Sequence, residues 1–292
     1  MSLKHCHFSI LYNELPFLKQ KLPFLYKNFE QIVFYDLNVG IEPHEYSTDG
    51  SHEYILNYPD PEKKILLIEE KCLNKVKTFL GHGSLQKQKM FSLGSKYVKN
   101  DIDVFWCTDM DEFFNSTLIK KVEDIFIEKK EINAIDLEHY VFWKDFNHII
   151  ADKNTNLMRL YSRIARHKPG NLYSHCAIQE QFKCHYINSN DQAYFHFAWL
   201  GDTRVRLKLK NYSTPPFGNS YLKPIYENYI KEVWEKRKNI NIPLNDTSLY
   251  MYPDIHPSPS LKKGVRRYDQ TISMPDYINY EELFFDLECD II

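Results

Sequence analysis

The chain has 292 residues, of which 43% are hydrophobic and 26% are charged, and its formal net charge is −2. This composition is that of a globular protein, and the near-neutral charge argues against a broad nucleic-acid-binding face. The six cysteines include no C-x-x-C pair, so neither a zinc site nor a redox dithiol is expected. The sequence has no signal segment and no apolar run of about 18 residues, so we expect a cytoplasmic protein or one bound peripherally to a membrane.

The first half of the chain alternates short apolar runs with helical patterns. The apolar runs predict strands at residues 7–12, 31–35, 65–68 and 104–108. The helical patterns predict helices at 16–29, 84–100 and 117–130. The first strand, helix and strand form a βαβ unit, which implies parallel strands. We therefore predict an α/β fold with a mostly parallel central sheet flanked by helices, and a loop over 40–62 that contains a short strand at 54–56.

The second half of the chain gives a weaker pattern. Strands are predicted at 134–143, 157–164 and 193–199, and helices at 201–212 and 221–238. The tail carries many prolines and few periodic runs, so we expect it to wrap the rest of the chain. The predicted organisation is one domain over 1–240 with an irregular or helical extension, 241–292, packed on it.

The most informative segment is the string FWCTDMDEFF, residues 105–114. An apolar strand runs directly into Asp109 and Asp111, two carboxylates that are separated by one residue. Mn²⁺ and Mg²⁺ prefer oxygen ligands, and a cation held here can bridge the phosphates of a nucleotide diphosphate and stabilise its departure. Acidic turns match this spacing by chance. Dehalogenase-type phosphatases also carry it after a strand, but usually near the N-terminus and without the Glu-Phe that follows here.

Three polar residues follow predicted strands directly. In open α/β sheets, ligands bind outside the carboxyl ends of the strands. Asn13, Asp36 and Asp109 therefore belong to the edge at which a ligand is expected.

The order of these motifs resembles the GT-A glycosyltransferases. The resemblance is carried by ILYNE at 10–14, IVFYDLN at 32–38 and DVFWCTDMDEF at 103–113. The arrangement is similar to the bisecting N-acetylglucosaminyltransferase family and to family-2-like bacterial and viral transferases. The bisecting family usually has Ile-Pro after its D-x-D-E, where this chain has Phe113-Phe114, so no sugar specificity is carried over.

The resemblance implies a metal-dependent enzyme with a nucleotide-sugar-binding, Rossmann-like fold. Its substrates would be a nucleotide-diphosphate sugar and a hydroxyl group of a glycan or glycoconjugate. The metal, Mn²⁺ or Mg²⁺, would be bound by Asp111, Asp109 and His196. The nucleotide sugar would contact Asn13, Asp36, Asn38, Asp109 and Lys208, and Lys208 lies on a basic helix with Arg204, Arg206 and Lys210.

Several alternatives stay open at this point. An inverting transferase needs a general base, for which Glu180 is favoured over Asp145 and Glu138. His196 in its aromatic strand is either a metal ligand or a packed core residue. The basic run Arg159, Arg163, Arg166, His167 and Lys168 is most simply a solvated face, and otherwise a phosphate contact. A protein that binds sugar or serves as a scaffold without turnover is the alternative function, which the intact Asp109 and Asp111 pair disfavours.

Overall fold

The structure is a computed structural model. It describes residues 2–37, 45–70, 89–152, 158–169, 183–188, 194–206, 250–251, 263–268 and 273–288. Asn38, Glu180 and Lys208 lie outside these ranges, as does the predicted helix at 221–238.

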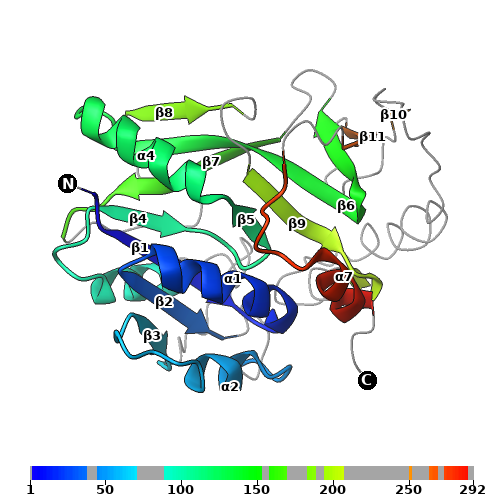
Figure 1. Cartoon of the computed structure of the whole chain (residues 1–292), viewed down its shortest axis with the longest axis horizontal. Coiled ribbons are helices and arrows are strands. Elements are labelled where there is room, and N and C mark those ends of the chain that lie inside the picture. The colour runs from blue at the N-terminus through cyan, green and yellow to red at the C-terminus, as the bar shows by residue number, and fades with distance from the viewer. Residues whose placement is uncertain are drawn as a thin grey trace, which may run out of the picture.

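One mixed sheet organises the described chain, in the order β10-β11-β6-β7-β4-β1-β2-β3 (Figure 1). Its N-terminal part consists of parallel strands, namely β3 (Ile65–Ile68), β2 (Gln31–Asp36), β1 (His5–Leu11) and β4 (Val104–Cys107). Most residues of these strands are apolar, and every residue of β1, β2 and β4 is buried, as expected for a parallel sheet that is covered on both faces. The four strands predicted in this part of the chain are confirmed.

The strand β6 (Ala134–Asp152) joins the parallel strands to the rest of the sheet. Its first part pairs with β7 (Met158–Arg166), which is antiparallel to β4, and with β8 (Cys184–Ile187). Its later part pairs with β9 (Tyr194–Leu200) and β11 (Lys263–Arg267), and β11 pairs with β10 (Tyr250–Met251). The short β5 (Glu112–Phe114) pairs with β9, so the chain after β4 is joined to the far half of the sheet.

Alternate residues of the parallel strands feed two hydrophobic clusters, one on each face of the sheet. On β4, Val104 and Trp106 enter the cluster that contains α1, while Phe105 and Cys107 enter the opposite cluster. This alternation follows from the two-residue period of a strand. On the opposite face, Gly94 ends the helical segment 89–94 directly over β1, and a Cβ atom there would lie 1.9 Å from Phe8 Cε2.

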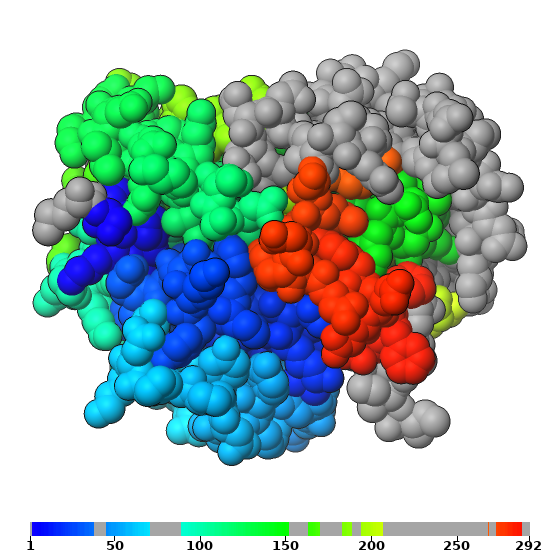
Figure 2. Space-filling view, viewed as in Figure 1, coloured from blue at the N-terminus to red at the C-terminus, as the bar shows by residue number. Residues whose placement is uncertain are grey.

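Three helices cover the face of the sheet on which Val104 and Trp106 lie (Figure 1). They are α1 (Leu15–Asn28), α4 (Ser116–Glu128) and α7 (Tyr280–Glu288). Figure 2 shows the segment 273–288 in red lying across the N-terminal residues in blue. Tyr277 stacks on Phe24 of α1 at 4.1 Å, and Lys19 lies 3.3 Å from Asp286. No helix within the described ranges has the length and apolar character that crossing a bilayer requires.

The structure corrects the sequence predictions at several elements. Residues 54–56 lie in a helix, α2 (Ser51–Leu56), rather than in a strand. Of the helix predicted at 84–100, residues 84–88 lie outside the described ranges, and the described part is helical over 89–94 and continues as the 3₁₀ helix η1 (Ser95–Tyr97). The strand predicted at 134–143 continues to Asp152. The α/β class is confirmed, but antiparallel pairs link β4 to β7 and β7 to β6, so the sheet is mixed. The tail contributes β10, β11 and α7.

Candidate functional site

Asp109 and Asp111 lie on a tight turn between β4 and β5. The Thr108 N–H donates to Phe8 O at 3.3 Å and so keeps this segment beside β1, while the Glu112 N–H donates to Asp109 O at 3.2 Å and closes the turn. Met110 is buried between the two aspartates. The turn therefore places both carboxylates at the carboxyl edge of the parallel strands.

The buried side chain of Glu112 stabilises the turn. Its side chain is fully buried, and its Oε2 accepts the Asp109 N–H at 2.8 Å and the Tyr194 hydroxyl at 2.9 Å. Its Oε1 accepts a hydrogen bond from Arg163 Nη2 at 2.8 Å. Burial, together with the charge of Glu112, raises the pKa of Tyr194 well above its ordinary value, so the hydroxyl keeps the proton it donates.

Arg163 of β7 is the partner of both Glu112 and Asp109. Its Nη2 lies 3.3 Å from Asp109 Oδ2, and its side chain is only 4% exposed. Burial disfavours its charged form, but Glu112 and Asp109 more than offset this and raise its pKa well above the ordinary value. The solvated-face interpretation is wrong for Arg163, because the pairing of β7 with β4 brings it beside the acidic turn.

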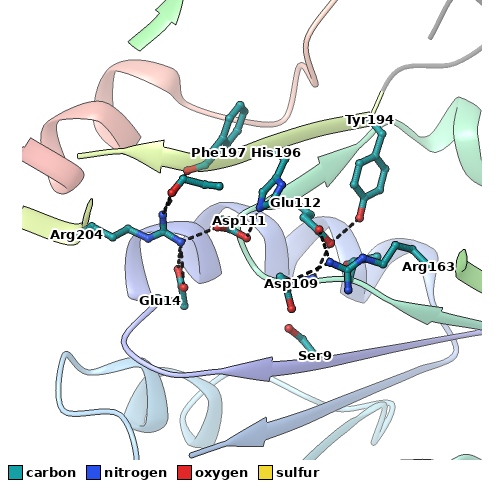
Figure 3. A network of polar contacts seen from close by, with 12 residues as sticks. Ser9, Glu14, Asp109, Asp111, Glu112, Arg163, Tyr194, His196, Phe197 and Arg204 are labelled. Atoms are coloured by element: carbon teal, nitrogen blue, oxygen red, sulfur yellow. Dashed lines mark hydrogen bonds and ion pairs between the residues drawn. The ribbon is translucent and has the colours of Figure 1, made fainter. Parts of the chain in front are cut away.

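Asp111 is joined to β9 and to the residues after it. Its backbone carbonyl accepts the Phe197 N–H at 2.8 Å. In the antiparallel pairing of β5 with β9, Glu112 lies opposite His196. As a result, His196 Nε2 lies 3.5 Å from Asp111 Oδ1 (Figure 3). Sequence reasoning had placed this histidine with Asp111, and the structure brings the two side chains together.

Arg204 contacts the other oxygen of Asp111. Its Nη2 lies 2.7 Å from Asp111 Oδ2 and 3.2 Å from Glu14 Oε1. Burial disfavours the charged form of Arg204, but Glu14 and Asp111 more than compensate and raise its pKa. The guanidinium lies over the ring of Phe17 at 4.8 Å, a cation–π contact. Arg204 thus joins the acidic turn to the loop after β1.

A buried lysine supports the same turn from α1. Lys21 Nζ donates to Asp109 O at 2.7 Å and to Thr108 Oγ1 at 2.8 Å, and Thr108 Oγ1 also lies 2.7 Å from His7 Nε2. Burial lowers the pKa of Lys21 to about 8, against the opposing effect of the nearby carboxylates. Sequence reasoning missed Lys21, although its place on the apolar stripe with Leu18, Leu22 and Leu25 was a usable signal.

Asp36 lies at the end of β2 and is buried. Its Oδ1 accepts the Ser47 hydroxyl at 2.6 Å and the Ser47 N–H at 3.0 Å, and its Oδ2 lies 2.7 Å from His52 Nδ1. Burial raises its pKa above the ordinary carboxyl value. Asp36, which was predicted to contact the nucleotide sugar, is buried, and its carboxylate contacts Ser47 and His52.

Asn13 and Glu14 connect this β2 edge to the acidic turn. The Asn13 N–H donates to Ser47 Oγ at 2.9 Å, and Asn13 Oδ1 accepts the Thr48 N–H at 2.8 Å. Asn13 has a φ of 56°, a left-handed conformation that asparagine tolerates better than most residues. Its neighbour Glu14 forms an ion pair with Arg204. Asn13 thus contacts the β2 edge through Ser47, while Glu14 contacts the acidic turn through Arg204.

The donor atoms at this edge suit a divalent cation that also binds a substrate. Mg²⁺ sites commonly use one or two carboxylates together with phosphate oxygens and waters, rather than a complete protein cage. Asp111 Oδ1 and His196 Nε2 lie 3.5 Å apart, close to the about 3 Å that separates neighbouring ligands of such an ion. No group of three or more metal-ligating side chains occurs in the described part of the chain. Asp111 and His196 are thus the pair that would hold the cation, with the remaining ligands coming from phosphate and water, while Asp109, the third predicted ligand, does not complete a group of three with them.

Two of the other predicted residues, Asp145 and Glu138, belong to β6. Asp145 Oδ1 accepts the Asn147 N–H at 2.7 Å and lies 2.8 Å from His148 Nδ1, so its carboxylate is engaged within its own turn of β6. Glu138 is on β6, opposite Arg159 of β7. Asn38, Glu180 and Lys208 fall in ranges that the structure leaves undescribed.

Comparison with known protein families finds no match to this chain, and comparison with curated proteins finds no similar sequence. The geometry of the site therefore carries the functional argument.

Proposed function

We propose that this chain is a glycosyltransferase that moves a sugar from a nucleotide-diphosphate sugar to a hydroxyl group of a glycan or glycoconjugate, with Mn²⁺ or Mg²⁺ as cofactor. The observation that supports this most is the approach of His196 Nε2 to within 3.5 Å of Asp111 Oδ1 at the carboxyl edge of the parallel strands. Carboxylate and imidazole are donors for Mn²⁺, and this edge is where α/β sheets bind nucleotides.

The chain's own residues keep the acidic turn in one geometry. Three side chains contact Asp109: Glu112 accepts its backbone N–H, Lys21 donates to its backbone carbonyl, and Arg163 lies beside its carboxylate. Asp109 is thereby fixed at three atoms before any ligand arrives, which is the preorganisation that electrostatic catalysis requires. When bound, the divalent cation would offset the charge that develops on the departing nucleotide diphosphate.

Transfer also needs a group that takes the proton of the acceptor hydroxyl. Glu180 remains our candidate for this base in an inverting reaction. Asp145 is a weaker candidate, because its carboxylate already accepts hydrogen bonds from its own turn.

A sugar-binding or scaffolding protein without turnover is the second candidate function. One observation favours it: Asp109 and Asp111 each have an arginine partner, Arg163 and Arg204, and ion pairs of this kind also serve a purely structural role. Turnover of a nucleotide sugar distinguishes the two functions.

The test is Mn²⁺-dependent hydrolysis across a panel of nucleotide sugars. A transferase without its acceptor slowly transfers the sugar of its donor to water. We expect hydrolysis of at least one donor, and its loss in Asp111→Asn and in chelator. The matched control is Asp124→Asn on the exposed side of α4, which should hydrolyse the donor at the wild-type rate. A donor at 100 times its Kd should also stabilise the fold by about 2.7 kcal/mol. Stabilisation without hydrolysis would favour the second candidate, and neither effect with any donor would reject both.

A further inference from the structure

Arg204 is shared between two carboxylates that come from different parts of the chain. The same nitrogen, Nη2, lies 2.7 Å from Asp111 Oδ2 and 3.2 Å from Glu14 Oε1 (Figure 3). The other terminal nitrogen, Nη1, donates to Ala198 O at 3.1 Å, and the guanidinium stacks over Phe17. Arg204 is therefore anchored on one side while its other side faces both acids.

We propose that Arg204 is an internal counter-ion that competes with the divalent cation for Asp111, and that Glu14 is the carboxylate that retains Arg204 when the cation binds. This inference rests on the proposed function in one respect, since it takes Asp111 as a metal ligand.

The competition follows from charge and distance. The Asp111 carboxylate meets Arg204 through Oδ2 and His196 through Oδ1, so a cation bound beside His196 lies close to the guanidinium. Two positive charges at such short range repel each other strongly in a partly buried site. Each therefore weakens the binding of the other to Asp111, and this coupling acts equally in both directions.

Glu14 makes the exchange possible without leaving a buried charge unpaired. Because Nη2 already lies between the two acids, a small shift toward Glu14 keeps Arg204 in an ion pair while its contact with Asp111 lengthens. A buried arginine without a carboxylate would be strongly unfavourable. The anchoring contacts with Ala198 and Phe17 keep the rest of the guanidinium in place during this shift.

The two partners consequently act on metal affinity in opposite directions. Arg204→Gln removes the competitor and should tighten Mn²⁺ binding by about tenfold or more. Glu14→Gln leaves Arg204 with Asp111 as its main acid and should weaken Mn²⁺ binding several-fold. A role that is only structural would change both affinities in the same direction.

The experiment titrates Mn²⁺ alone into the full chain and follows free Mn²⁺ by electron paramagnetic resonance, with no nucleotide present. Arg204→Lys serves as the conservative variant and should bind Mn²⁺ more weakly than Arg204→Gln, because the competing charge is kept. Arg206→Gln is the matched control, since it removes a charge of the same short helical segment that pairs with Asp202 instead; its affinity should stay within about twofold of wild type. Circular dichroism checks that each variant is folded. If Arg204→Gln does not fold, the weaker Mn²⁺ binding expected of Glu14→Gln still tests the inference.

Opposite shifts in Arg204→Gln and Glu14→Gln support the inference, including the case in which only Arg204→Gln binds Mn²⁺ measurably. If wild type binds Mn²⁺ and both variants bind it as tightly as wild type or more weakly, the counter-ion role is wrong and the metal site stands. The same holds if Glu14→Gln binds Mn²⁺ more tightly than wild type. If wild type and Arg204→Gln both fail to bind Mn²⁺, metal ligation by Asp111 is itself rejected, and the inference with it.

Discussion

Glu112 Oε2 accepts the backbone N–H of Asp109 at 2.8 Å, so the last residue of the Asp-Met-Asp-Glu segment holds the first in place. The same carboxylate binds Arg163 and Tyr194 and has no exposed surface. Glu112 is therefore a positioning residue, whereas Asp109 and Asp111 lie at the edge where a ligand would bind.

Glu112→Gln should destabilise the fold strongly, because it removes the carboxylate at 2.8 Å from buried Arg163 and leaves, among the described residues, the more distant Asp109 at 3.3 Å. We expect the free energy of unfolding, measured by denaturant titration, to fall by about 2–4 kcal/mol. The control is Glu128→Gln at the exposed end of α4, which should change stability by less than about 0.5 kcal/mol. A loss below about 1 kcal/mol for Glu112→Gln would mean that water or a rearranged side chain replaces the ion pair.

His7 should make the protein sensitive to acid. Burial, with the nearby charge of Lys21, lowers the pKa of His7 well below the ordinary 6.5. Below pH 6.5 the unfolded chain therefore binds a proton at His7 that the folded chain does not, so the free energy of unfolding falls as pH falls. The expected slope is up to about 1.4 kcal/mol per pH unit between pH 6.5 and 5.

The measurement for His7 is the difference between wild type and His7→Gln over this pH range, which removes the contributions of other groups such as Asp36. The variant should show the shallower dependence on pH. Parallel stability curves for the two proteins would show that His7 is protonated in the folded state or exchanges freely with solvent.

Much of the parallel half of the fold follows from the sequence, because strands covered on both faces are continuous apolar runs. The segment 51–56 was missed because Tyr54 and Ile55 suggest a strand. Its helix is set by polar contacts of its first turn, where the Ser51 N–H donates to Asp49 and the Ser51 hydroxyl accepts the Glu14 N–H. Neither the local bond to Asp49 nor the long-range bond to Glu14 leaves a periodic signal in the sequence.

The candidate site was predictable in part for a similar reason. Asp109 and Asp111 stand out because they follow an apolar strand, and His196 was placed with them by resemblance alone. Arg163 was not predictable from its own segment, where it is one of several basic residues. It becomes a buried partner of Glu112 only because β7 returns antiparallel to β4.

Gly94→Ala should disturb the packing of segment 89–94 on β1. The added Cβ would lie 1.9 Å from Phe8 Cε2, and the Phe8 ring packs against both Phe91 and Phe105. We expect a loss of about 1–3 kcal/mol or more, measured by thermal or denaturant unfolding. The double variant with Phe8→Leu should lose less than the sum of the two single changes, since the smaller side chain makes room. Simple additivity would contradict this close contact.

Asp36→Asn should weaken donor binding more than it slows donor hydrolysis. The carboxylate orients Ser47 and His52 at the β2 edge, and a base or ribose bound there is held equally in the ground and transition states. We therefore expect the donor Kd, measured by calorimetry, to rise by about tenfold with little change in kcat. His52→Gln should have a similar effect, and the double variant should lose little more than either single one, because both act through the same contact.

The matched control is Asp60→Asn. Asp60 also organises a loop, through the N–H groups of Lys64 and Ile65, but it does so before β3 rather than at the carboxyl ends of the strands. This variant should lose stability while its donor Kd stays near the wild-type value. If Asp36→Asn leaves the Kd unchanged, or if Asp60→Asn raises it to the same extent, then the β2 edge is outside the nucleotide pocket, and the hydrogen bonds of Asp36 serve only the fold of the loop at 45–51.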